Sequence, residues 1–128
     1  MSLTNAFETS TLQYLLTAGS VTRPTAWYVG LFTSDPTDTG VAGTEVAGNG
    51  YTRVAATFTV SGDTASNSAS IEFPAASGGN WGTVGWIGIM DAASGGNMII
   101  HSALTTAKAI NDGDVFRIPT GDLDITAS

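Results

Sequence analysis

The pattern of apolar and polar positions predicts a buried β-hairpin in the second half of the chain. Two apolar runs, at residues 84–90 and 98–104, are separated by a spacer at 91–97 that is rich in residues tolerating positive φ. Neither run alternates cleanly between apolar and polar positions, so both faces of the pair should be buried. We expect the hairpin of residues 81–104 to form the centre of the fold.

Further strands are predicted on both sides of this hairpin. Residues 26–33 are apolar on both faces and should also lie centrally. Residues 51–60 alternate, and the expected inward positions are Val54, Ala56, Phe58 and Val60. A shorter strand is predicted at 69–73, a weak edge segment at 105–110, and closing strands at 115–119 and 123–126. The expected core residues of these segments are Ala69, Ile71, Phe73, Val115, Ile118, Leu123 and Ile125.

One helix is predicted, at residues 2–18. Its apolar stripe consists of Leu3, Phe7, Leu12, Leu15 and Leu16. Asn5 is the expected N-cap with Glu8 as its capping-box partner, Ser2 is an alternative cap, and Gly19 should end the helix. Residues 1–20 would thus form a helical arm. A terminal helix usually packs over one end of its own sheet, and the alternative is docking on a neighbouring subunit.

Short strands separated by turns, together with a single helix, predict an all-β fold. We expect one β-sandwich domain, jelly-roll-like, that spans residues 1–128 and includes the helical arm. A long loop at residues 34–50 has no periodicity and carries Asp35, Asp38 and Glu45. Loops of this length within compact domains are often functional, so this loop is a candidate interaction surface.

The amino-acid composition limits the kinds of partner that the chain can bind. Only 12% of the 128 residues are charged, the formal net charge is −7, and the few cations are scattered along the chain. Nucleic-acid binding is therefore not expected, because phosphate neutralisation needs clustered Lys and Arg. The chain has no cysteine, no apolar run of membrane-spanning length and no basic and apolar leader. We expect a soluble protein without disulfides, thiolate metal sites or an export signal.

No constellation of residues points to catalysis. His101 is the only histidine, and the adjacent Ser102 should point to the opposite face of a strand, so the two cannot form a nucleophile and base pair. No nucleophile elbow, phosphate-binding loop or dinucleotide fingerprint occurs. We expect no enzyme activity and a structural role for His101.

The carboxylates do not match a metal-binding motif. Asp35, Asp38 and Glu45 share the long loop, and Asp112 and Asp114 flank a turn glycine. Calcium needs six to eight converging oxygen ligands, and neither group has the spacing of a calcium-binding loop. We therefore expect no metal and no cofactor.

The tryptophans raise the question of a sugar-binding platform. Trp27 and Trp86 lie in apolar runs and are expected in the core. Trp81 stands among Gly and Asn residues at a strand entrance. Its ring either plugs one end of the sandwich, the more common role, or is exposed for a glycan or a partner.

The order and spacing of many short motifs resemble a family of small bacteriophage virion proteins, almost from end to end. The first block comprises residues 28–33 (YVGLFT), Asp35, Pro36, Asp38, Gly40, residues 43–46 (GTEV), Gly48, Gly50, Tyr51 and Arg53. The second comprises residues 66–68, 71–74, 81–84, Gly88, Ile89, Asp91, Ala92, residues 95–97, 103–105, Gly113 and Asp114. Members are usually labelled phage tail-fibre or head-fibre proteins. The resemblance implies a structural protein without catalytic or cofactor residues.

Two virion roles compete. A tail fibre needs reach, usually through a trimeric stalk, and this chain has no heptads or repeats. A capsid decoration (cement) protein needs a compact domain, often as a trimer at three-fold positions. The short chain without heptads or repeats favours the capsid decoration role. We therefore expect a homotrimer that binds the major capsid protein, in a virion assembled in the host cytoplasm. The alternatives are a tail-fibre or baseplate-associated protein for host attachment, and a carbohydrate-binding module.

The candidate interaction residues follow from these features. They are Leu3, Phe7 and Leu15 on the arm, Asp35, Asp38 and Glu45 on the long loop, and Trp81. The expected partners are other virion proteins and further copies of the chain. No nucleic acid or membrane is expected, and a surface glycan stays open as a partner.

Overall fold

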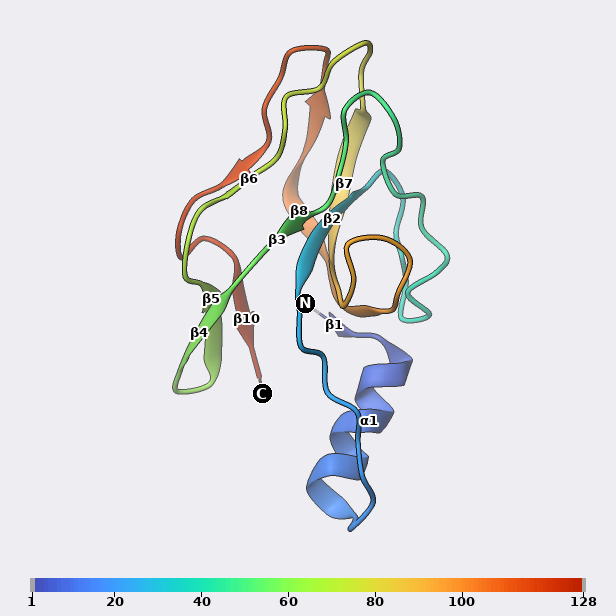
Figure 1. Cartoon of the computed structure of the whole chain (residues 1–128), viewed down its shortest axis with the longest axis vertical. Coiled ribbons are helices and arrows are strands. Elements are labelled where there is room, and N and C mark those ends of the chain that lie inside the picture. The colour runs from blue at the N-terminus through green and yellow to red at the C-terminus, as the bar shows by residue number, and fades with distance from the viewer. Residues whose placement is uncertain (1, 128) are drawn as a thin grey trace.

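The computed structural model describes residues 2–127 and confirms the predicted fold class, mostly β with antiparallel sheets and one N-terminal helix, α1 (Asn5–Leu16) (Figure 1). The five-stranded sheet has the order β1 (Ser2–Leu3), β8 (Met98–Ile110), β7 (Gly82–Met90), β2 (Tyr28–Phe32) and β3 (Val54–Ala55). A three-stranded sheet has the order β10 (Asp124–Thr126), β5 (Thr64–Asn67) and β4 (Phe58–Ser61). A two-stranded sheet pairs β6 (Ile71–Glu72) with β9 (Arg117–Ile118).

The β7–β8 hairpin is central, as predicted. Strand β7 lies between β8 and β2, and Ile89 is paired with Ile100 on one side and Val29 on the other. Burial on both faces holds for the second half of β7 and for most of β2. It does not hold for β8, where residues 105–109 are exposed. These residues continue β8 without a break and pair with β7 on one side only, so the predicted edge segment at 105–110 does lie at an edge but belongs to the hairpin strand.

Two hydrophobic clusters lie on opposite faces of the five-stranded sheet. The larger joins its inner face to the smaller sheets, as in a sandwich, through Val29, Leu31, Ile87, Ile89, Ile71, Phe73, Phe116 and Leu123, among others. The smaller contains Phe32, Met90 and Met98 on the outer face. Adjacent residues such as Leu31 and Phe32 belong to different clusters because side chains alternate along a strand. The inner cluster therefore fixes how the sheets pack together.

The predicted strand at 51–60 is two strands in two sheets. The chain crosses between the sheets at Ala56 and Thr57, where the Ala56 amide bonds to the Trp27 carbonyl and the Thr57 carbonyl to the Ser68 amide. Ala56 is buried, but Val60 is 75% exposed at the tip of the β4–β5 hairpin. The prediction that Val60 points into the core is wrong, because β4 leaves the large sheet before reaching it.

The sequence also misplaces several closing segments. Strand β5 was not predicted, because its residues (TASN) have no apolar alternation. Ala69 and Val115 are exposed rather than core, and strand β9 is shorter than the predicted 115–119. The buried Asn67 holds this region together: its amide nitrogen donates to the carbonyls of Ala69 and Pro119.

Two identical substitutions test this placement of the core. Val29→Ala, at a side chain that is fully buried, should lower the free energy of unfolding by about 2 kcal/mol through lost burial and a cavity. Val60→Ala is the matched control and should change it by less than about 0.5 kcal/mol. Chemical denaturation measures both, and equal losses would contradict the crossing of the chain between two sheets.

Candidate interaction surface

The helix begins and ends at residues other than those predicted. It spans Asn5–Leu16, because Ser2 and Leu3 form strand β1. The N-cap is Thr4, not Asn5 or Ser2, and its side chain makes no capping hydrogen bond. At the other end, the Thr17 hydroxyl donates to the Gln13 carbonyl and accepts from the Gly19 amide, so the helix ends before the predicted glycine stop.

The root of the arm is anchored to the large sheet. Strand β1 pairs Ser2 with His101 and Leu3 with Ile100. The buried Thr4 donates its amide to the Ile99 carbonyl (3.0 Å) and its hydroxyl to the Met98 carbonyl (2.7 Å). The Thr4 hydroxyl is therefore engaged by β8 instead of capping the helix. The arm leaves the body in a fixed direction.

The helix itself contacts little of its own sheet. None of its residues is buried, and it extends away from the sheets in Figure 1. The exposed large apolar side chains are Leu12 (58%), Tyr14 (74%), Leu15 (66%) and Leu16 (76%). Leu3 and Phe7, nearer the root, pack partly against the core. The expectation that the helix packs over its own sheet is wrong, and an apolar surface stays open to a partner.

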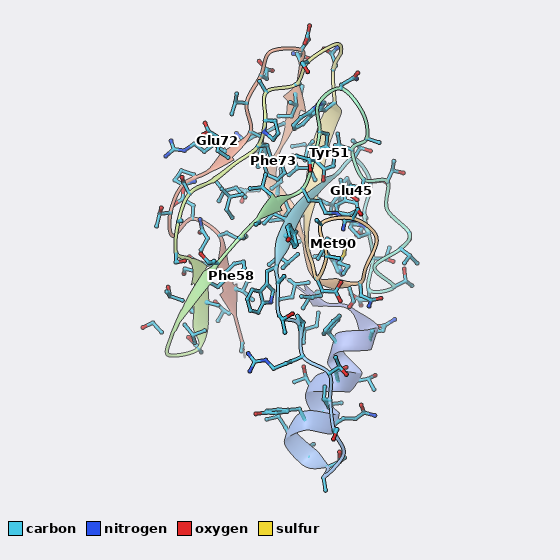
Figure 2. The ribbon with its side chains drawn as sticks, in the orientation of Figure 1. Glu45, Tyr51, Phe58, Glu72, Phe73 and Met90 are labelled. Carbon is cyan, nitrogen blue, oxygen red and sulfur yellow. The ribbon has the colours of Figure 1, made fainter. Side chains whose placement is uncertain are left out.

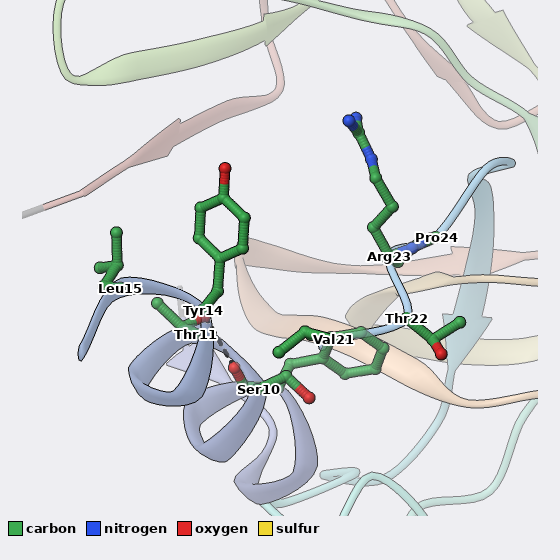
Figure 3. A pocket seen from close by; sticks show the side chains of 9 residues that line it. Ser10, Thr11, Tyr14, Leu15, Val21, Thr22, Arg23 and Pro24 are labelled. Carbon is green, nitrogen blue, oxygen red and sulfur yellow. Dashed lines mark hydrogen bonds between the residues drawn. The ribbon is translucent and has the colours of Figure 1, made fainter. Parts of the chain in front are cut away.

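A shallow groove runs between the helix and the segment that follows it. The side chains that line it include Phe7, Tyr14, Leu15, Val21 and Pro24, and its volume is about 430 Å³. Figure 3 shows Tyr14 and Arg23 extending to the same side, one from the helix and one from the returning segment. The groove adds an apolar floor and one cation to the exposed helix surface.

The long loop is held by Arg53 rather than presented freely. The guanidinium donates to both carboxylate oxygens of Glu45, through Nε and Nη2, at 2.8 Å each. Its Nη1 donates to the carbonyls of Ala92 and Gly95 in the β7–β8 loop. The Arg53 side chain is only 9% exposed and that of Glu45 24%. Glu45 is thus engaged within the chain, although it was predicted as an interaction residue.

Tyr51 completes this network (Figure 2). Its hydroxyl donates to Glu45 Oε2 (2.6 Å) and accepts from the Leu31 amide (3.0 Å). Burial, together with the bond to the Glu45 carboxylate, raises the pKa of the Tyr51 hydroxyl well above its usual range. The bond to Glu45 also raises the pKa of the Arg53 guanidinium. The network ties the long loop to β2 through Tyr51 and to the β7–β8 loop through Arg53.

The other two loop carboxylates have different surroundings. Asp38 Oδ1 lies 2.9 Å from His101 Nε2, and the Asp38 carbonyl accepts from the Asn5 amide. Asp38 therefore links the loop to β8 and to the start of the helix. Asp35 is exposed and accepts from the Thr37 amide. His101 thus has an acidic partner that the sequence did not indicate.

Trp81 is not an exposed ring. It is 6% exposed, its indole nitrogen donates to the Asn49 carbonyl (2.9 Å), and its ring meets Tyr51 edge to face. The interpretation in which Trp81 plugs the sandwich is correct, and it offers no surface to a partner. Trp27 and Trp86 were expected in the core but are only partly buried.

Sequence reasoning missed the residues that anchor the candidate surface. Tyr51 and Arg53 belonged to the predicted strand at 51–60 and to the motif block but were given no anchoring role, and Thr4 had no assigned role. The one signal that could have found them is chemical: Arg53 is among only four cations in a chain with eleven acidic residues, which favours an ion pair for each cation. The sequence could not identify Glu45 as the partner of Arg53, because the two side chains meet only when the turns between residues 45 and 53 fold the chain back.

The structure adds two observations about other kinds of site. Within residues 2–127, no group of three or more His, Asp or Glu side chains gathers as a metal site would require. In the same part of the chain, the helix lacks the length and apolarity needed to span a bilayer.

Comparison with known proteins gives one family. Residues 2–126 match the family described as Podophage GP4 fiber I protein gp80. This match covers nearly the whole chain, including the helical arm and all the sheets. No curated protein matches the chain significantly.

Removing the charge of Glu45 tests the Arg53 network. Glu45→Gln should lower the free energy of unfolding by about 1–3 kcal/mol, because Arg53 would keep its charge in a largely buried position. Glu8→Gln, on the exposed helix, is the control and should shift it by less than about 0.5 kcal/mol. Chemical denaturation is the measurement, and a neutral Glu45→Gln would mean that the ion pair does not hold the loop.

Tyr51 predicts a specific sensitivity to alkali. Its folded-state pKa lies above the ordinary value of about 10, so ionisation favours the unfolded chain and stability should fall as pH rises beyond that value. Tyr51→Phe should be less stable at neutral pH by about 1–2 kcal/mol, but its stability should decline less in alkali. Denaturation curves on both sides of pH about 10 compare the two proteins. If the stability of both proteins fell equally with rising pH, Tyr51 would not be the group responsible.

Proposed function

We propose that this chain is a fibre subunit whose N-terminal arm docks on a neighbouring virion protein. The premise is that the chain belongs to the podophage GP4 fiber I protein gp80 family. The family consists of non-enzymatic structural proteins of phage virion fibres. The chain is accordingly a virion component, and other virion proteins are its partners. The family supports the fibre role over the capsid decoration role that chain geometry favoured.

Length constrains how such a fibre is built. A compact domain of 128 residues has a radius of gyration of roughly 14 Å, so one copy has little reach. A fibre made from this domain needs several copies or further proteins, and each copy then needs surfaces for its neighbours. The exposed arm supplies one such surface.

The observation that carries the proposal is the apolar helix surface on a fixed root. Burying the exposed parts of Leu12, Leu15 and Leu16 would contribute roughly 3–6 kcal/mol in total. Association costs about 4–15 kcal/mol, so one arm alone would bind weakly. Additional contacts at the groove beside Tyr14 and Arg23, or several arms acting together, would make the attachment stable. We therefore also propose that the subunit works as a homo-oligomer.

A polar variant of the arm tests this role. Leu12→Gln, Leu15→Gln and Leu16→Gln together should leave thermal unfolding unchanged, since these side chains are exposed, but reduce incorporation into particles by about tenfold or more. Asn5→Gln, Ala6→Gln and Thr9→Gln, also exposed on the helix, form the matched control.

Quantitative mass spectrometry of purified particles measures both incorporation and copy number. Normal incorporation of the polar variant would reject the arm as the docking element. A copy number close to that of the major capsid protein would favour capsid decoration, whereas a small fraction of it fits a fibre.

A further inference from the structure

A shallow pocket on the outer face of the large sheet combines an aromatic ring with polar groups. Its volume is about 330 Å³, and it is lined by Ser2, Asp35, Trp86, His101, Ser102 and Ala103. These residues come from β1, the long loop, β7 and β8. We propose that this pocket binds one residue of a neutral saccharide. The inference goes beyond the structural role of the arm, and it does not depend on it.

Trp86 provides the apolar floor. The residue is only partly buried: it packs against the outer cluster of Phe32, Met90 and Met98 and also lines the pocket. Packing on this cluster restrains the indole, so little side-chain freedom remains to be lost on binding. A restrained and partly exposed aromatic face suits the apolar C–H face of a sugar ring.

The polar group beside Trp86 that stays open to a ligand is an acceptor. His101 Nε2 is engaged, because a carboxylate only accepts and Nε2 therefore donates to Asp38. Asp35 Oδ1 accepts from the Thr37 amide, which leaves Oδ2 for a ligand. The Ser102 side chain points to the other face of the sheet, because Ser102 is paired with Ile87 of the inner cluster, so its hydroxyl supplies no group to a ligand here. A ligand in this pocket must therefore bring a hydrogen-bond donor for Asp35.

This donor requirement selects the chemical class. Sugar hydroxyls are abundant donors and need no countercharge. Phosphate, sulfate and carboxylate ligands would be repelled by Asp35 and by the net charge of −7. Organic cations are usually enclosed by several aromatic rings, and the lining offers only the Trp86 indole and the His101 imidazole, which is engaged by Asp38. The volume lies at the lower end of the roughly 300–1,000 Å³ range of ligand pockets, so one sugar ring fits better than an oligosaccharide.

Saturation-transfer NMR on the full chain tests the pocket. The probes are the methyl glycosides of glucose, galactose and mannose, N-acetylglucosamine, and glucuronic acid as the charged comparison. At least one neutral sugar should bind, and glucuronic acid should bind more weakly. No binding by any neutral sugar, or a preference for glucuronic acid, would overturn the proposal.

Three variants locate the binding. Trp86→Phe should weaken the affinity for the bound sugar by about tenfold, because the smaller ring loses stacking area. Asp35→Asn, at an exposed position, keeps an oxygen for the Thr37 amide but replaces the free acceptor with a donor. It should weaken binding by about three- to tenfold.

Trp27→Phe is the matched control, since Trp27 is also partly buried but lines a different groove on the inner face. It should bind like the original protein. If Trp27→Phe lost binding while Trp86→Phe and Asp35→Asn kept it, the sugar would lie in the other groove and the assignment would be wrong.

Discussion

The position of the long loop depends on one buried cation. Arg53 binds both oxygens of Glu45 and two carbonyls of the β7–β8 loop, so a single side chain joins segments that are far apart in the sequence. Residues 34–50 are also held by the bridge between Phe32 and Glu45, by the contacts of Asp38 with Asn5 and His101, and by the bonds of Asn49 to Ser77 and Trp81. Asp35 and Asp38 belong to this loop, so the same ion pair helps to hold the loop side of the pocket beside Trp86.

Small residues in the sheet make room for this arrangement. Gly30 and Gly88 are paired across β2 and β7. A methyl group at Gly30 would come within 2.9 Å of the Glu45 carboxylate, and one at Gly88 would meet Met98 and Phe32. The two glycines therefore let Glu45 and the outer cluster lie directly on the sheet. Larger residues in their place would displace the loop even though the strands would still pair.

Periodicity predicted the parts of the fold whose burial is decided locally. The β7–β8 hairpin and strand β2 were found because their apolar residues are close in sequence, and the helix was found from its apolar period although none of its residues is buried. The failures have a common physical origin in contacts distant in sequence. Val60 is exposed because the chain changes sheets at Ala56, and Thr4 does not cap its helix because its hydroxyl is engaged by β8. Only some of the predicted interaction residues lie on the candidate surface. Leu15 is available for docking, whereas Glu45 and Trp81 are engaged inside the domain by partners that spacing could not reveal.

The anchoring of Thr4 also orders the events of folding. The hydrogen bond from its hydroxyl to the Met98 carbonyl joins residues 94 positions apart. Contacts so distant in sequence form late, because the intervening chain must first be ordered. During synthesis the helix can form early, yet it cannot take its final direction until strand β8 has left the ribosome and paired with β7. The arm therefore reaches its final direction only in a nearly complete domain.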